Sequence, residues 1–252
     1  MSDSIVYSRA GHVGRLLLNC PEVHNALGRE QLDTITRYLE AISADDEVRV
    51  LIVTGAGGKS FCAGASLREL GEGQMSDDAF QRMTGRLASM RVPTICALNG
   101  NVFGGGVELA ASCDFRIGVE GSRMRVPAAA FGLCYPAAGI QRLVECLGVS
   151  VTRRVLMAAE EFDSNSMQKI GFLDRLVPAE EFERVVQAFA ENIVELGPLA
   201  VQSMKNILAQ AASGGIDFSA AAELSARCLE STDLQEGLAA QREKRKPRFN
   251  NH

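Results

Sequence analysis

The chain has 252 residues, of which 46% are hydrophobic and 23% are charged, and its formal net charge is −5 at pH 7. This length and composition are typical of a globular protein with one large domain, and the acidic balance argues against a nucleic-acid-binding protein. No apolar run reaches the roughly 18 to 20 residues that a membrane helix needs, and residues 1–4 lack the basic and apolar regions of a signal peptide.

The numbers and positions of the cysteines and histidines limit the disulfides, metal sites and histidine-based catalytic sites that the chain could form. Seven cysteines are dispersed without paired spacing, which is typical of reduced thiols in a cytoplasmic protein. The three histidines are His12, His24 and His252, which give no basis for a zinc site or a histidine-based catalytic triad. We therefore expect a cytoplasmic protein without a bound metal.

The first part of the chain begins an alternation of strands and helices. Residues 4–19 predict two strands joined by a turn at residues 11–14, and residues 27–42 have the apolar period of a helix. A β-rich apolar run at residues 48–54 predicts a buried strand, and a loop rich in glycine and small residues follows at residues 56–75.

The alternation continues through the middle of the chain. Residues 77–90 predict a helix and residues 92–98 a strand. A second helix is predicted directly after the glycines at 104–106, followed by a strand at residues 114–119. Strands that alternate with helices indicate the α/β class.

The last part of the chain is nearly all helical by its apolar period. Four helices are predicted, at residues 180–196, 198–212, 218–228 and 234–243. We therefore divide the chain into a core at residues 1–195 and a C-terminal helical region at residues 196–252.

One glycine-rich segment resembles a phosphate-binding P-loop. Residues 55–60, Gly-Ala-Gly-Gly-Lys-Ser, follow a predicted strand. The P-loop pattern needs a glycine where this chain has Val53, and the sequence continues into residues 61–64 without helical period. We therefore do not expect a nucleoside triphosphate site.

Two other small-residue segments point to chemistry at the backbone. Three consecutive glycines at residues 104–106 open a predicted helix that carries Glu108 in its first turn. Residues 61–67, Phe-Cys-Ala-Gly-Ala-Ser-Leu, follow the buried strand. Small residues let a ligand approach backbone N–H groups closely, and two such donors from separate loops form an oxyanion hole. The simplest alternative is a glycine-rich turn before a buried helix, with Glu108 as a solvated charge.

These segments resemble the crotonase superfamily, also called the enoyl-CoA hydratase/isomerase family. Residues 19–27 look like its first helix entry, Cys113-Asp114 follows the glycine-rich helix as in the family, and residues 236–249 look like its C-terminal signature. The resemblance covers nearly the whole chain. It implies an α/β spiral of ββα units with a C-terminal helical region that trimerises, and family members are commonly hexamers built as dimers of trimers.

The resemblance also implies roles for individual residues. The backbone N–H groups of Ala65 and Gly105 match the two donors that hold the thioester oxygen. Ala63, Leu67 and Arg68 match positions that contact the adenine and pantetheine of coenzyme A. The expected partner is therefore an acyl-CoA thioester. Coenzyme A is part of that substrate, and no separate cofactor is expected.

The chain departs from the family at one catalytic position. Hydratases of this family use two glutamates around a catalytic water, and Glu108 matches the first of them. Ala128 stands where the second belongs, and alanine cannot move a proton. Family isomerases usually depend on that second glutamate as well. A positioned acid or base contributes about 10² to 10⁴ in rate, so Glu108 would have to act alone.

Tyr135 supports a different reaction. Residues 132–139 resemble the tyrosine-containing loop of methylmalonyl-CoA decarboxylase, a crotonase relative that also lacks the second glutamate. That relative carries histidine where this chain has Ala65, the common hydratase residue. In this alternative Tyr135 would orient the leaving carboxylate or protonate the enolate.

The sequence therefore predicts an acyl-CoA-processing enzyme that hydrates or isomerises an enoyl-CoA. The alternatives are decarboxylation of a malonyl- or methylmalonyl-type CoA thioester and acyl-CoA binding without catalysis. A purely structural trimerisation module is a further alternative, in which Glu108 would have no task.

Overall fold

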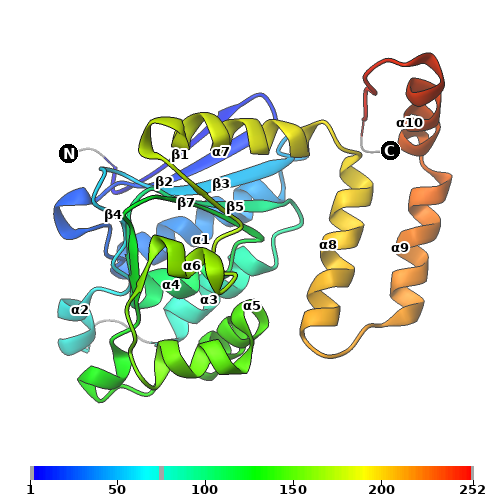
Figure 1. Ribbon diagram of the computed structural model, residues 1–252. Helices are drawn as coiled ribbons and strands as arrows, with labels where there is room; N and C mark the ends of the chain where they lie inside the picture. The colour runs from blue at the N-terminus through cyan, green and yellow to red at the C-terminus, as the bar shows by residue number, and fades with distance from the viewer. Residues whose placement is uncertain (1–2, 74–76, 251–252) are drawn as a thin grey trace.

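The computed structural model describes residues 3–73 and 77–250. Two sheets form the core, one with six strands in the order β1-β2-β3-β5-β7-β10 and one with four in the order β4-β6-β8-β9 (Figure 1). The strands are β1 Ile5–Ala10, β2 Val13–Leu18, β3 Val50–Gly55, β4 Ser60–Cys62, β5 Thr94–Leu98, β6 Asn101–Phe103, β7 Phe115–Val119, β8 Arg123–Arg125, β9 Phe162–Asp163 and β10 Arg175–Val177.

The chain winds through both sheets in a repeating path. Strands β3, β5 and β7 lie side by side and parallel in the large sheet, and β4, β6 and β8 do so in the small one. Each turn thus adds one strand to each sheet before a helix returns the chain. The helices are α1 Arg29–Ser43, α2 Leu67–Gly71, α3 Asp77–Ala88, α4 Gly105–Ala111, α5 Ala137–Leu156, α6 Ser164–Lys169, α7 Ala179–Val194, α8 Pro198–Ala212, α9 Phe218–Glu230 and α10 Thr232–Glu243.

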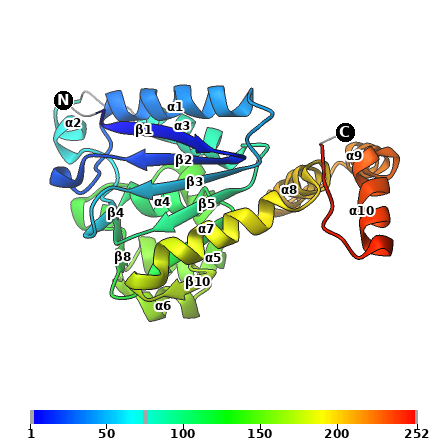
Figure 2. The same ribbon diagram turned by 90° about the horizontal axis from the view of Figure 1, so that it is seen from above.

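Helices cover both faces of the large sheet (Figure 2). Leu51 and Val53 of β3 pack into one apolar core together with α1 and α3, while Val50 and Ile52 pack into a second core with α7. Successive side chains of a strand point to opposite faces, so a strand covered on both sides is apolar throughout. This explains the continuous apolar run that predicted a buried strand.

Most predicted elements of the core are present with shifted ends. The predicted loop at residues 56–75 is wrong in part, because it contains strand β4 and the short helix α2. Its last residues, 74 and 75, lie outside the described residues, as do residues 1–2 and His252. The turn predicted at residues 11–14 is confined to Gly11 and His12. Helix α5 has no counterpart among the predicted elements.

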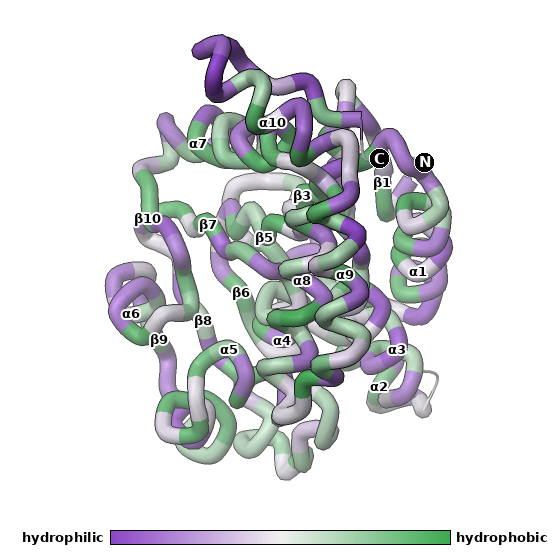
Figure 3. Tube along the Cα trace, turned by 90° about the vertical axis from the view of Figure 1, so that its right-hand side faces the viewer, coloured by the Kyte–Doolittle hydropathy of each residue, from purple (hydrophilic) through white to green (hydrophobic). Residues whose placement is uncertain are grey.

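The C-terminal helices α8, α9 and α10 extend away from the two-sheet core (Figures 1 and 2). Figure 3 looks onto α8 and α9, and both carry hydrophobic segments along their length. The four predicted C-terminal helices are confirmed with small shifts of their ends. The division into a core and a helical region at residues 195 and 196 stays a prediction.

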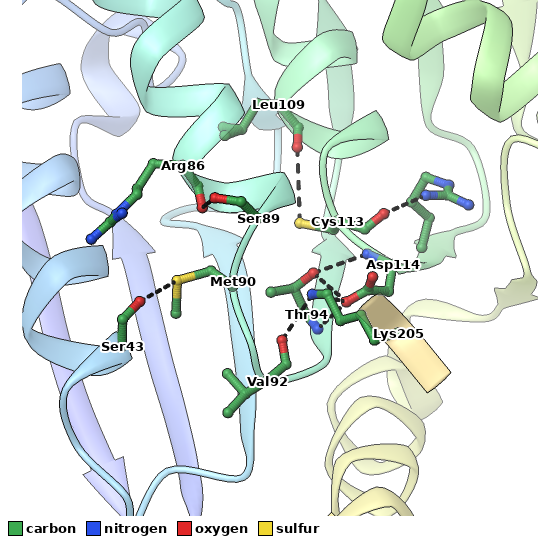
Figure 4. Close-up of polar contacts among 11 residues, drawn as sticks. Ser43, Arg86, Ser89, Met90, Val92, Thr94, Leu109, Cys113, Asp114 and Lys205 are labelled. Atoms are coloured by element: carbon green, nitrogen blue, oxygen red, sulfur yellow. Dashed lines mark hydrogen bonds and ion pairs between the residues drawn. The ribbon is translucent and has the colours of Figure 1, made fainter. Parts of the chain in front are cut away.

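Asp114, from the Cys113-Asp114 pair, ties this helical region to the core (Figure 4). Its Oδ2 atom accepts hydrogen bonds from Thr94 N at 2.7 Å and Thr94 Oγ1 at 2.8 Å, at the start of β5. The same oxygen accepts from Lys205 Nζ of α8 at 2.6 Å, and Lys205 also donates to Val92 O at 2.9 Å. The Asp114 carboxylate therefore has a structural role.

Candidate active site

The two glycine-rich segments meet because they follow neighbouring parallel strands. Strands β4 and β6 pair in the small sheet, so the loops after them leave the same edge side by side. Gly64 has a φ of 88°, and a Cβ there would lie 2.4 Å from Gly105 N. Only glycine fits such a position, because it accepts this φ and has no Cβ.

The backbone N–H groups of Ala65 and Gly105 are both available to a ligand. Around Ala65, Leu27 N donates to Gly64 O and Ser66 N donates to Leu27 O, and this bridge leaves the N–H of Ala65 unused. Gly105 is the first residue of α4, where N–H groups lack an intrahelical acceptor. Within residues 3–73 and 77–250, neither N–H donates to a protein acceptor.

A cavity of about 300 Å³ lies beside these two donors. Its wall is mainly apolar and combines the loops after β4 and β6 with parts of α2, α3, α4 and the segment before α5. The lining residues are Ala63, Ala65, Leu67, Leu70, Phe80, Gln81, Phe103, Gly104, Gly105, Glu108, Pro127, Ala128, Phe131, Leu133, Tyr135 and Pro136. Among the predicted site residues, only Arg68 does not line this cavity, and it is exposed on α2.

Glu108 is buried, with 1% of its side chain exposed. Its Oε1 atom accepts hydrogen bonds from Thr84 Oγ1 at 2.8 Å and from the Arg142 guanidinium at 3.0 Å. Its Oε2 atom accepts from Gln81 Nε2 at 3.1 Å. A carboxylate enclosed in this way is not a solvated helix-end charge, so that alternative for Glu108 is wrong.

Tyr135 brings a hydroxyl group next to this carboxylate. A Cβ built on Gly139 would lie 2.5 Å from both Tyr135 Cε1 and Glu108 Oε2, so the two side chains converge over the same backbone atom. Tyr135 Oη is buried. Burial raises the pKa of Tyr135 well above its ordinary value, and both the charge of Glu108 and a hydrogen bond to Glu108 raise it further. The hydroxyl therefore keeps its proton at neutral pH.

Ala128 lies in the cavity wall with 7% exposure, at the start of a short 3-10 turn, Ala128–Phe131. Its methyl group supplies no proton donor or acceptor. In the described lining, Glu108 and Tyr135 are the two ionisable side chains. Any proton transfer by the described wall therefore falls to these two residues or to bound water.

Three residues that hold Glu108 were not predicted from the sequence. Gln81 and Thr84 come from α3, and Arg142 comes from α5. Thr84 interrupts the apolar face of α3, with Phe80 one turn before it, and is fully buried. A buried polar residue on an apolar stripe is the signal that was available. Arg142 gave no signal, because α5 itself was not predicted.

No metal centre or membrane segment is found in the described part of the chain. Its histidine, cysteine and acidic side chains form no group of three or more that could hold a metal ion. None of its helices combines the length and apolar character needed to cross a membrane.

Comparisons with known proteins identify the family of this chain. A family model described as enoyl-CoA hydratase/isomerase matches residues 9–252. A short-chain-enoyl-CoA hydratase of Clostridium acetobutylicum is 30% identical, over 97% of this chain and 96% of the relative. A crotonyl-CoA hydratase of Syntrophomonas wolfei is 31% identical, over 98% of each chain.

A solved structure gives the same result for the fold. An enoyl-CoA hydratase/carnithine racemase from Magnetospirillum magneticum superposes with a TM-score of 0.94 at 27% identity, covering 100% of this chain and 97% of the other. The similarity therefore includes the two-sheet core and the C-terminal helices. The chain belongs to the enoyl-CoA hydratase/isomerase family, and its activity is of that type.

Proposed function

We propose that this enzyme hydrates the double bond of an enoyl-CoA thioester, with Glu108 as its single acid–base group. The observation that carries the proposal is a buried glutamate in the wall of an apolar cavity that also presents two unpaired backbone N–H groups. The names of the two bacterial relatives, a short-chain-enoyl-CoA hydratase and a crotonyl-CoA hydratase, support a short acyl chain.

The proposed reaction follows from the positions of these groups. The thioester oxygen accepts hydrogen bonds from Ala65 N and Gly105 N. A water oxygen bonds to the β-carbon, and the electron pair of the double bond moves toward the thioester oxygen to form an enolate. Glu108 takes a proton from the water and returns it to the α-carbon, so the net change is the addition of one water. Loss of one such oxyanion donor costs about 3 to 4 kcal/mol in known enzymes.

A single glutamate can serve both proton transfers in this scheme when the water and the new α-proton add to the same face of the planar substrate. Gln81, Thr84 and Arg142 fix its carboxylate from two helices. Preorganisation of this kind avoids the cost of ordering the group during the reaction. Ala128 leaves room where a second carboxylate would stand.

Contacts with the coenzyme A portion are proposed from α2 and the loop before it. Ala63 and Leu67 line the cavity, and Leu67 is 63% exposed. This position supports contact with the pantetheine arm as it leaves the cavity. The exposed guanidinium of Arg68 follows Leu67 on α2 and has the chemistry to pair with a phosphate.

Decarboxylation is the second candidate because Tyr135, a buried proton donor, lines the cavity beside Glu108. That hydroxyl has the chemistry to hold a leaving carboxylate. A substrate carboxylate in this position would lie near the negative charge of Glu108, which disfavours its binding. Ala65, in place of the histidine of the decarboxylase relative, also favours hydration.

A panel of CoA thioesters followed by mass spectrometry tests the proposal. We expect crotonyl-CoA to gain the mass of one water, and malonyl-CoA and methylmalonyl-CoA to remain unchanged. Release of CO₂ from either malonyl compound, without hydration of crotonyl-CoA, would establish the decarboxylase alternative. Binding of all thioesters without any turnover would establish the non-catalytic binder.

We also propose that the enzyme works as a homotrimer, or as a hexamer of two trimers, assembled through α8, α9 and α10. These helices form a groove of about 610 Å³. Large side chains in this region are exposed to solvent in the single chain, among them Met204, Leu208, Phe218, Leu229 and Leu238. An apolar surface of this kind is typical of a subunit interface.

We propose a cytoplasmic location for the enzyme. The seven cysteines are free thiols, which supports this location.

A further inference from the structure

Helix α2 is a short element that presents Leu67 and Leu70 to the cavity and Arg68 to solvent. It has five residues, Leu67–Gly71, and helices as short as this are not stable on their own in water. Its position therefore depends on contacts with the rest of the chain. Two sets of contacts join it to the segment at the start of α1.

The first set is a backbone bridge directly before α2. Leu27 N donates to Gly64 O at 2.8 Å, and Ser66 N donates to Leu27 O at 2.9 Å. The two hydrogen bonds flank Ala65, whose N–H is one of the two unpaired donors at the cavity. Because the bridge uses backbone atoms only, it holds Ala65 independently of the side chains of α2.

The second contact is the side chain of Glu69, which reaches from α2 to the first turn of α1 (Figure 2). Its Oε2 atom accepts a hydrogen bond from Arg29 N at 2.9 Å. Arg29 is the first residue of α1, where N–H groups lack an intrahelical acceptor and carry a partial positive charge. The carboxylate thus supplies the helix cap that Gly28, which occupies the N-cap position without a side chain, cannot supply.

Gly28 makes room for this carboxylate. A Cβ built on Gly28 would overlap Glu69 Oε1, and it would lie 2.8 Å from Glu69 Cδ and 2.9 Å from Glu69 Oε2. The φ of Gly28 is −90° and its ψ is −179°, a conformation that any residue adopts. The backbone therefore does not require glycine here, and it is the Glu69 carboxylate that occupies the space of a side chain.

We propose that Glu69 is a positioning residue that clamps α2 to the start of α1, so that Leu67 and Arg68 are in place before the thioester binds. The contacts of these two residues with coenzyme A rest on the proposed function. Without the clamp, the apparent affinity falls with the fraction of the protein in which α2 is in place. Ala65 N stays in position through the backbone bridge, so the turnover of bound substrate changes little.

Binding and turnover by the intact enzyme separate this role from a purely structural one. In Glu69→Ala the Kd of butyryl-CoA, a saturated thioester that cannot be hydrated, should rise about 3- to 10-fold by calorimetry, the effect of losing a helix cap. The KM of crotonyl-CoA should rise by a similar factor, while kcat stays within about 2-fold of the wild type. Glu69→Gln keeps an oxygen that can accept from Arg29 N, so it should restore most of the affinity. A residue that only stabilised α1 would lower the free energy of unfolding and leave Kd and KM unchanged.

Gly28→Ala tests the same contact from the other side. The added methyl group should displace the carboxylate end of Glu69 and raise the Kd of butyryl-CoA about as much as Glu69→Ala does. In the double variant the methyl group meets no carboxylate, so the two effects should not add. Glu30→Ala is the matched control, because it removes an exposed carboxylate from the same turn of α1. Its Kd should equal that of the wild type.

An unchanged Kd in Glu69→Ala would overturn the clamp, and so would a fall in kcat alone. Additive losses in the double variant would show that Gly28 and Glu69 act separately. An equal loss in Glu30→Ala would assign the effect to negative charge at the helix end and not to the contact with α2. The proposed hydration fails separately, when the wild type adds no water to crotonyl-CoA, and the Kd of butyryl-CoA still tests the clamp in that case.

Discussion

At the scale of single residues, the site is set by where side chains are absent as much as by where they are present. Gly64 lets the β4 loop approach the start of α4, and Ala128 leaves open the position of a second carboxylate. In the proposed mechanism the acid–base work is concentrated on Glu108, which three neighbouring side chains hold in place. Each of these features predicts the effect of a substitution.

Gly105→Val should abolish most of the activity while the chain stays folded. A Cβ at Gly105 would lie 2.6 Å from the Phe80 ring, so the added side chain displaces the cavity wall and the N–H donor with it. Loss of one oxyanion donor lowers kcat by about 10² to 10³. Gly58→Val is the control, because nothing lies within 4 Å of a Cβ there. Near-normal turnover in Gly105→Val would remove Gly105 from the oxyanion hole.

Arg142→Leu should destabilise the protein strongly, because it leaves the Glu108 carboxylate buried without its cation. Removing one partner of a buried ion pair costs about 3 to 5 kcal/mol. The double variant Arg142→Leu with Glu108→Leu should recover much of that free energy of unfolding. Urea denaturation measures both values. A single variant as stable as the wild type would show that this ion pair contributes little.

At the scale of elements, the position of each loop follows from strand pairing. The donors come together because β4 and β6 are parallel neighbours, and Glu108 enters the cavity because α4 starts directly after β6. The C-terminal helices depend on a different connection. Asp114, which lies between α4 and β7, joins β5 to α8 through Thr94 and Lys205.

Lys205→Met should loosen the C-terminal helices without changing the cavity. Lys205 is 12% exposed and its ammonium group pairs with Asp114 at 2.6 Å, so the variant leaves a partly buried carboxylate with one donor fewer. We expect faster amide hydrogen exchange in α8 and α9 and a loss of about 1 to 3 kcal/mol. Lys246→Met is the control, since its ion pair with Glu195 is exposed. Unchanged exchange in α8 would contradict the structural role of Asp114.

At the scale of the whole molecule, the sequence predicted the α/β class, five of the six described strands of the large sheet and the helical C-terminal region, but none of the described strands of the small sheet. Buried elements such as β3 were predictable because a strand covered on both faces is continuously apolar. Helix α5 was not, because it combines exposed positions with a break at Gly148, where φ is 71°. Because α5 was not predicted, the role of Arg142 was not predicted either. Its contact with Glu108 depends on how α5 packs against α4. Contacts of this kind join residues far apart in the chain and leave no local pattern.

The apolar groove of the C-terminal helices predicts the assembly state. Sedimentation should give a trimer or hexamer of the 27.0 kDa subunit. Leu229→Glu should shift the distribution toward smaller species, because Leu229 is 69% exposed in the single chain and lines the groove. A charge there cannot be buried against a neighbouring subunit without a large cost. A clean monomer of the wild type at micromolar concentration would contradict the proposed interface.

The central claim is that Glu108 alone carries the proton transfers of an enoyl-CoA hydration. Its most direct test is the rate of crotonyl-CoA hydration by the wild type and by Glu108→Gln, which keeps the shape of the side chain and removes the base. The account predicts conversion to 3-hydroxybutyryl-CoA by the wild type and a loss of about 10² or more in the variant. Normal crotonyl-CoA turnover by Glu108→Gln, together with its loss in Tyr135→Phe, would contradict the claim.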